Sequence, residues 1–174
     1  MPDGGPIEAH TDLVKKLDYE CELAVVLGRD ARDVPAVRPR DYTLRLYHLE
    51  RCLSPGCADG AQQWYFGKSL DGFTPIGPCI VTVDAFADYP PRLGIRSFVN
   101  GEKRQNSNTA LQIFDIDHVI AELSQGMTLK AGTIIATGTP AGVGMGMDPP
   151  QFLKPGDVVR CEIEGIGTLT NPVK

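Results

Sequence analysis

Glycine and proline interrupt this sequence so often that only short secondary-structure segments fit between them. The chain has 19 Gly and 14 Pro among its 174 residues; proline breaks helices and glycine favours turns. Several of the remaining segments are rich in Val, Ile and Thr, the residues that favour strands. No repeat, low-complexity stretch or linker divides the chain. The pattern therefore predicts one β-rich α+β domain with one or two helices.

Strand signals recur along the whole chain. The apolar residues that end at Val99 are followed by Asn100-Gly101, a strong hairpin signal because both residues tolerate positive φ angles. A second hairpin is expected around Gly165 near the C-terminus. We expect strands at residues 18–27, 78–83, 94–99, 133–137, 158–163 and 167–169.

One segment has a helical period. Ile116, Val119, Ile120 and Leu123 fall on one face of a helix. Asp115 or Asp117 can cap its N-terminus, and Gly126 can end it. His118 lies inside this helix, where we expect it to be a surface residue.

Charge and cysteine content narrow the functional classes. The net charge is −5 and the basic residues are scattered, so nothing indicates a nucleic-acid or membrane-surface partner. The apolar stretches are too short to span a bilayer. The five cysteines form an odd, dispersed set, which is typical of free thiols. We therefore expect an intracellular protein, in the cytoplasm or the mitochondrion.

Glu20 and Glu22 are two residues apart in an expected strand. Residues at this spacing point to the same face, so the two carboxylates would project together. Such a pair is tolerated in water or around a cation, and hard divalent ions are bound by one to three carboxylates. The residues alone leave two interpretations open, an exposed acidic strand face and a metal site.

Two further segments could contact an anion. The residues from Thr137 to Gly144 follow an apolar strand, and their glycines would let backbone N–H groups approach a ligand. A plain turn explains the same glycines equally well. Lys68 follows Gly67, but the full phosphate-loop pattern is absent, so the motif by itself indicates only a surface lysine.

Taken in order, these segments resemble the fumarylacetoacetate hydrolase family. The resemblance implies a mixed β-roll, barrel-like, around a Mg²⁺ or Mn²⁺ ion, usually in a homodimer. It also implies small 2-oxo or 2,4-dioxo acids as substrates, of the acylpyruvate or oxaloacetate type. The reaction would be C–C hydrolysis, decarboxylation or keto–enol tautomerisation. The matching stretches are residues 17–28, 62–82, 99–109, 123–144 and 152–169.

The resemblance also implies roles for individual residues. Glu20 and Glu22 match the family's first two metal-binding carboxylates. Lys68 matches the lysine that faces the substrate's enolate or carboxylate oxygen, a catalytic role. Gly138, through its backbone, and Thr139 match the residues that hold the substrate carboxylate. With the resemblance, the metal interpretation of the glutamate pair becomes the favoured one.

The chain departs from the family pattern in two places. Residues 1–16 form only a short N-terminal extension before the domain at 17–174, where family members have a longer segment. Residues 45–61 are aberrant, and Arg51 falls where the family has its third metal ligand, an aspartate. This leaves a second hypothesis, a catalytically inactive family member that serves for binding or dimerisation, or an incomplete gene product.

The boundaries of the aberrant segment are sharp, at Arg45 and Ala61. We expect that it is read in a shifted frame, because suitable codons read one base later restore the family motif. A segment that was never selected to pack should be poorly ordered, or fit the sheet badly.

Overall fold

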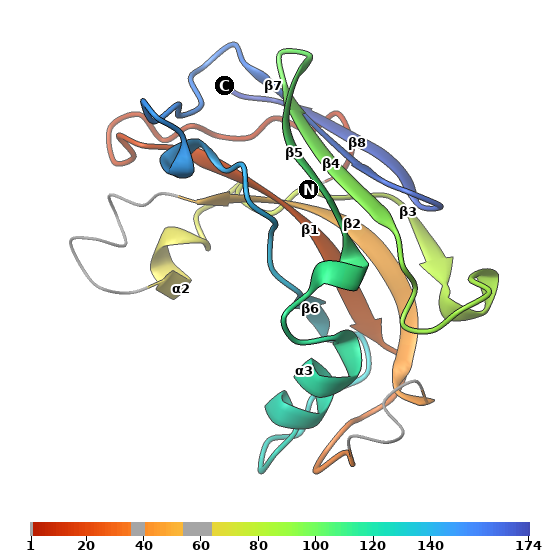
Figure 1. The fold of residues 1–174 in the computed structure, drawn as a ribbon. Helices are drawn as coiled ribbons and strands as arrows, with labels where there is room; N and C mark the ends of the chain where they lie inside the picture. The colour runs from red at the N-terminus through yellow and green to blue at the C-terminus, as the bar shows by residue number, and fades with distance from the viewer. Residues whose placement is uncertain (1, 36–40, 54–63) are drawn as a thin grey trace.

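The structure is a computed structural model that describes residues 2–35, 41–53 and 64–174. Eight strands and two α-helices lie within these ranges (Figure 1). The helices are α2 (Trp64–Gly67) and α3 (Ile116–Leu123). The strands are β1 (Asp18–Leu27), β2 (Thr43–Leu53), β3 (Ile76–Thr82), β4 (Gly94–Val99), β5 (Glu102–Asn108), β6 (Ile134–Ala136), β7 (Val158–Ile163) and β8 (Gly167–Pro172).

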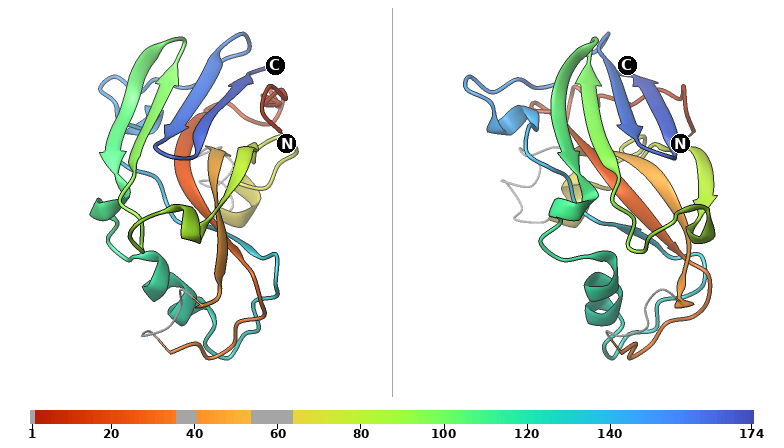
Figure 2. Two further views of the ribbon diagram at one scale, coloured as in Figure 1. Left: turned by 90° about the vertical axis from the view of Figure 1, so that its right-hand side faces the viewer. Right: turned by 45° about the vertical axis from the view of Figure 1, so that its right-hand side comes forward.

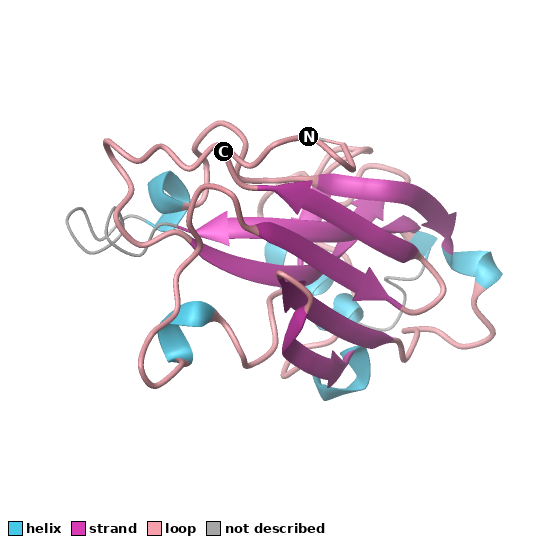
Figure 3. Ribbon diagram, turned by 90° about the horizontal axis from the view of Figure 1, so that it is seen from above, coloured by secondary structure: helices cyan, strands magenta, loops and turns pink. Residues whose placement is uncertain are grey.

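The strands form two four-stranded antiparallel sheets, in the orders β3-β2-β1-β6 and β5-β4-β7-β8. Figure 2 shows the sheets as two layers, and Figure 3 shows helical turns both around and behind the strands. The predicted β-rich α+β class is confirmed. Within the described residues the two sheets remain separate and do not close into a barrel.

The hydrophobic core lies where β1 faces the second sheet. Cys21, Leu23 and Val25 are at most 1% exposed and pack in one cluster with Ile95 of β4 and Cys161 of β7. Alternate residues of a strand point to opposite faces. The even-numbered residues of β1 therefore face away from this cluster, and they carry the acidic groups.

Local signals located several elements accurately. Asn100 and Gly101 adopt φ angles of 52° and 84° and join β4 to β5, as the hairpin signal predicts. The Asp115 side chain accepts a hydrogen bond of 2.8 Å from the N–H of His118 and caps α3. His118 is exposed, so its predicted surface position is confirmed.

The segment that we expected to pack poorly divides into two parts. Residues 45–53 form most of β2, and their pairing with β1 runs without interruption from Arg45 opposite Val26 to Leu53 opposite Asp18. The backbone of these residues therefore follows the edge of β1 in regular register, and their poor order stays a prediction. Residues 54–61 lie outside the described residues.

The first residues of the chain lie beside its last strand. Ile7 is fully buried and bridges Val173 in parallel orientation. The Ile7 N–H donates to the carbonyl of Pro172 at 2.8 Å. No helix among the described residues is long and apolar enough to cross a membrane.

Candidate metal and substrate site

Three acidic side chains share one face of β1. Asp18, Glu20 and Glu22 alternate along the strand and therefore project to the same side. Their exposed fractions are 0%, 8% and 1%. A buried carboxylate is costly unless a charge or hydrogen-bond donor compensates it. The partners of each carboxylate therefore determine what the face can do.

Lys68 compensates Glu20. Its ammonium nitrogen lies 2.6 Å from Glu20 Oε2, and the two side chains are only 20% and 10% exposed. Helix α2 places the lysine, because the Lys68 N–H donates to the carbonyl of Trp64 at 3.1 Å. Partial burial strengthens the attraction relative to an exposed pair. The structure thus brings two of the predicted site residues into direct contact.

The loop after β6 meets Glu22. The backbone N–H of Gly138 donates to Glu22 Oε2 at 2.6 Å, a short bond of the charge-assisted kind. Gly138 has a φ angle of 98°, a conformation that favours glycine. The Thr137 hydroxyl donates to the carbonyl of Leu23 at 2.8 Å and holds the loop against β1.

Thr139 lies in the same loop, but its hydroxyl is engaged within the protein. It donates to the carbonyl of Cys21 at 2.9 Å and accepts from Gln105 Nε2 at 2.8 Å. A hydroxyl has one proton to donate. In this conformation Thr139 therefore holds the loop on β1 and has no proton left for a substrate.

Gln105 was not identified from the sequence. It is fully buried on β5, accepts from the N–H of Cys21 at 3.1 Å and donates to both Thr139 and the carbonyl of Pro140. Its only sequence signal is its place within the stretch 99–109 that resembles the family. A single glutamine in a polar strand gives no indication of burial.

Asp18, which the sequence analysis also did not identify, holds the turn at Gly144 and Met145. Its carboxylate accepts from the N–H groups of Tyr19, Gly144 and Met145 at 2.7–2.8 Å. Burial raises the pKa of Asp18, and these three donors only partly oppose the shift. The spacing of two residues from Glu20 was the signal that could have placed Asp18 on the acidic face.

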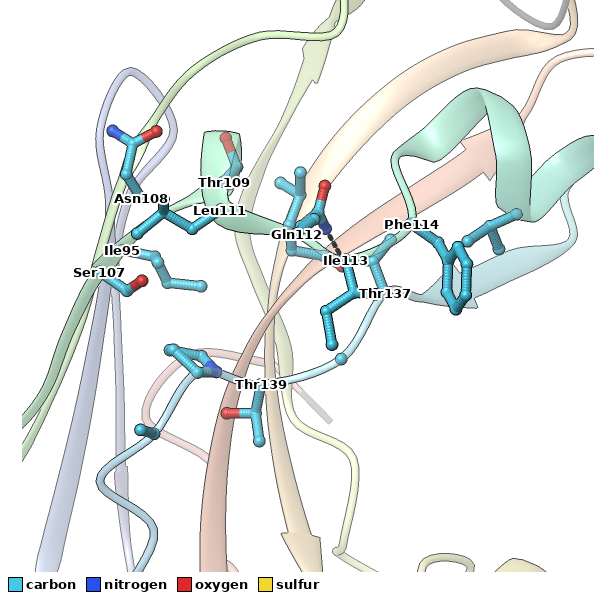
Figure 4. Close-up of a pocket in the computed structure, with 15 residues that line it drawn as sticks. Ile95, Ser107, Asn108, Thr109, Leu111, Gln112, Ile113, Phe114, Thr137 and Thr139 are labelled. Atoms are coloured by element: carbon cyan, nitrogen blue, oxygen red, sulfur yellow. Dashed lines mark hydrogen bonds between the residues drawn. The ribbon is translucent and has the colours of Figure 1, made fainter. Parts of the chain in front are cut away.

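The 137–141 loop borders a pocket of about 480 Å³ (Figure 4). Uncharged residues from the segments 107–114 and 137–141 line it, together with Leu23. The Gln112 amide donates to the Thr137 hydroxyl at 2.9 Å across it. Glu20, Glu22 and Lys68 do not line this pocket, so the loop borders both the pocket and the acidic face.

Comparisons with known proteins assign the chain to a family. The C-terminal domain model of fumarylacetoacetate (FAA) hydrolase matches residues 1–174. The chain belongs to the fumarylacetoacetate hydrolase family. A fumarylacetoacetate hydrolase from the psychrophile Exiguobacterium antarcticum has 45% sequence identity and a TM-score of 0.96, over 99% of this chain and 62% of that one.

Two further relatives of this family are bacterial. An uncharacterised protein of Staphylococcus saprophyticus is 44% identical over 97% of this chain and 56% of its own length. A 2-hydroxyhepta-2,4-diene-1,7-dioate isomerase from Mycobacterium marinum is 37% identical, with a TM-score of 0.86, over 99% of this chain and 64% of that one. The chain therefore spans a little over half to two thirds of the length of these relatives.

The described residues supply only part of a set of metal ligands. Two carboxylates on one strand face suit a hard divalent ion, which takes oxygen ligands. Within the described ranges, however, no group of three or more His, Cys, Asp or Glu side chains is placed to hold a metal. Position 51 pairs with Glu20 in the β1–β2 register, and it is occupied by arginine. The donor set fits a cation only in part.

Proposed function

We propose that Glu20 and Glu22 bind a divalent cation, Mg²⁺ or Mn²⁺, at a site that acts on small 2-oxo or 2,4-dioxo acids. The observation that carries the proposal is the contact of Lys68 with the buried carboxylate of Glu20, two residues from Glu22 on the same strand face. Carboxylates and a lysine that are buried together are characteristic of catalytic and ligand-binding sites. The names of the related hydrolase and isomerase support this substrate class.

Each residue has a distinct part in this proposal. A bound cation would supply a Lewis acid for the adjacent keto and carboxylate oxygens of the substrate. Lys68 places an ammonium group where negative charge develops when an enolate forms. Gly138 and Thr139 lie next to the proposed substrate position. Thr139 contributes by holding the loop in place through its hydroxyl. The reaction is C–C hydrolysis, decarboxylation or keto–enol tautomerisation.

A second function is favoured by one specific observation. The backbone position opposite Glu20 carries Arg51, and a cation there opposes metal binding. In the alternative, the chain is an inactive family member that binds or dimerises through the same fold. The intact register of β2 is compatible with such a scaffold role, because it requires the sheet and not the ligand set.

Turnover by the purified chain separates the two functions. Oxaloacetate and acetylpyruvate are assayed with and without Mg²⁺ or Mn²⁺, for the chain itself and for the Glu22→Gln, Lys68→Met and Gln125→Ala variants. The first function predicts metal-dependent turnover that both site variants lose and that Gln125→Ala, at an exposed position, retains. Turnover that survives Glu22→Gln contradicts the site. Turnover that appears only after Arg51→Asp supports the inactive alternative.

A further inference from the structure

Gln105 is the only buried residue of β5, a strand whose sequence is otherwise polar. A buried amide is costly unless its donors and acceptor are bonded. Here the carbonyl oxygen accepts from Cys21, and the amide nitrogen donates to Thr139 and to Pro140. Both amide protons are used, and the side chain joins β5, β1 and the 137–141 loop.

These bonds lie along a stretch of β1 that β6 does not pair with. Strand β6 pairs with β1 only at Ala24–Val26. Beyond that point no strand among the described residues pairs with this edge of β1, and at Cys21 side chains bond to the backbone instead. The Cys21 N–H donates to Gln105, and the carbonyl of Cys21 accepts from Thr139. This is the stretch of β1 that carries Glu20 and Glu22.

We propose that Gln105 and Thr139 form a latch that positions the carboxylate of Glu22, and that neither residue donates a proton to substrate. The latch fixes the loop on the edge of β1, and the loop then directs the Gly138 N–H to Glu22 Oε2 at 2.6 Å. The significance of this positioning for metal binding rests on the proposed function. The latch itself rests only on the hydrogen bonds.

The direct test is hydrogen exchange at the Gly138 amide, measured by NMR relative to the amides of β7. Gln105→Leu removes all three bonds and replaces the amide with an apolar side chain of similar size. We expect the relative exchange rate of the Gly138 amide to rise at least about tenfold, because the loop loses the two bonds from Gln105 to Thr139 and Pro140 that help to hold it on β1.

The matched control is Asn171→Leu. Asn171 is another buried amide, 1% exposed on β8, and it donates to the carbonyls of Pro2 and Gly5 at 3.1 and 2.8 Å. This variant should lose stability without changing the relative exchange rate at Gly138. Equal changes in both variants, or no change in a folded Gln105→Leu protein, would overturn the latch.

The hydroxyl of Thr139 provides a second, conservative pair. Thr139→Val is isosteric and removes the hydroxyl, whereas Thr139→Ser keeps it. The latch predicts that the valine variant reproduces the Gln105→Leu exchange change and that the serine variant stays within about twofold of wild type. A serine variant as fast as the valine variant would contradict the role of the hydroxyl.

Mn²⁺ titration connects the latch to the proposed function. Residues that orient a metal ligand typically change metal affinity 10–100-fold, so Gln105→Leu should raise the Mn²⁺ dissociation constant about tenfold and Asn171→Leu should not. If wild type binds no Mn²⁺, the proposed metal site fails while the exchange measurements still decide the latch. If wild type binds and Gln105→Leu binds equally well, the latch does not position Glu22 for metal.

Discussion

Among single residues, Lys68 has the most direct energetic role in the acidic face. Its ammonium compensates a carboxylate that is almost removed from water, at 2.6 Å. Removing one partner of such a pair costs more than removing both, because an uncompensated charge remains. Lys68→Met should therefore lower the free energy of unfolding by about 2 kcal/mol, less than a fully buried pair because both groups retain some solvent contact.

The double variant Glu20→Gln/Lys68→Met is the control for this prediction. It removes the charge that Lys68→Met leaves behind, so denaturant titration should recover more than half of the loss. A double variant less stable than Lys68→Met alone would contradict this prediction, because it would mean that partners other than Lys68 stabilise the Glu20 carboxylate.

Asp18 predicts a pH dependence of stability. Burial raises its pKa above the ordinary value of 3.8, so the folded protein binds the proton more tightly than the unfolded chain. The resulting stabilisation is complete below about pH 3.8 and is lost as the pH rises through the raised pKa. Asp18→Asn does not titrate, and it loses an acceptor for the N–H groups of Gly144 or Met145, which costs about 1–3 kcal/mol.

The measurement is the difference in unfolding free energy between wild type and Asp18→Asn across this pH range. The difference should be largest at acid pH and should narrow as the pH rises, since only wild type loses the proton-linked contribution. A difference that widens with pH would mean that the three N–H donors outweigh burial and lower the pKa of Asp18.

At the scale of elements, the loop between β6 and β7 depends on close backbone contacts. A Cβ at Gly142 would collide with the backbone carbonyl of Arg104, and its φ angle is 110°. Gly142→Ala should lower the free energy of unfolding by at least about 2 kcal/mol. Gly146→Ala is the control, because its Cβ would lie 3.8 Å from the nearest atom, in Val143. Thermal unfolding that ranks the two variants equally would contradict this account.

The elements also show what the sequence could and could not predict. β1, β4, β7 and α3 have the expected bounds, because apolar patterning, the Asn100-Gly101 turn and the Asp115 cap are local signals. The Asn100-Gly101 signal implied a partner strand after the turn, but the bounds of β5 could not be given because its residues are polar and its pairing with β4 defines them. β2 was missed because its apolar residues do not alternate regularly along the segment, and the strand is defined by its pairing with β1 and β3.

The candidate site likewise combines residues that local signals identify with residues that only the folded structure brings together. Glu20 and Glu22 could be placed on one face by their spacing alone. Lys68 and Gly138 could be connected to them only through the resemblance to the family, since they come from segments far apart in the sequence. Gln105 could not be found, because its burial depends on where the second sheet meets the 137–141 loop.

At the scale of the whole molecule, the proposed site depends on three segments that meet at β1. The strand brings two carboxylates, the segment after α2 brings Lys68, and the loop after β6 brings Gly138. The described part of the fold supplies no third metal ligand beside them. The β1–β2 register places residue 51 opposite Glu20, which is the position from which the family resemblance expects that ligand.

Calorimetric titration with Mn²⁺ of the chain and of its Arg51→Asp variant tests this account most directly. The number of carboxylates sets the affinity for hard ions, and the variant replaces a cation with a carboxylate at the position paired with Glu20. The account predicts weak binding by the chain, at least about tenfold tighter binding by the variant, and loss of both when Glu22→Gln is added. Equally tight binding by the chain and the Arg51→Asp variant, or binding that survives Glu22→Gln, would contradict a metal site built on Glu20 and Glu22.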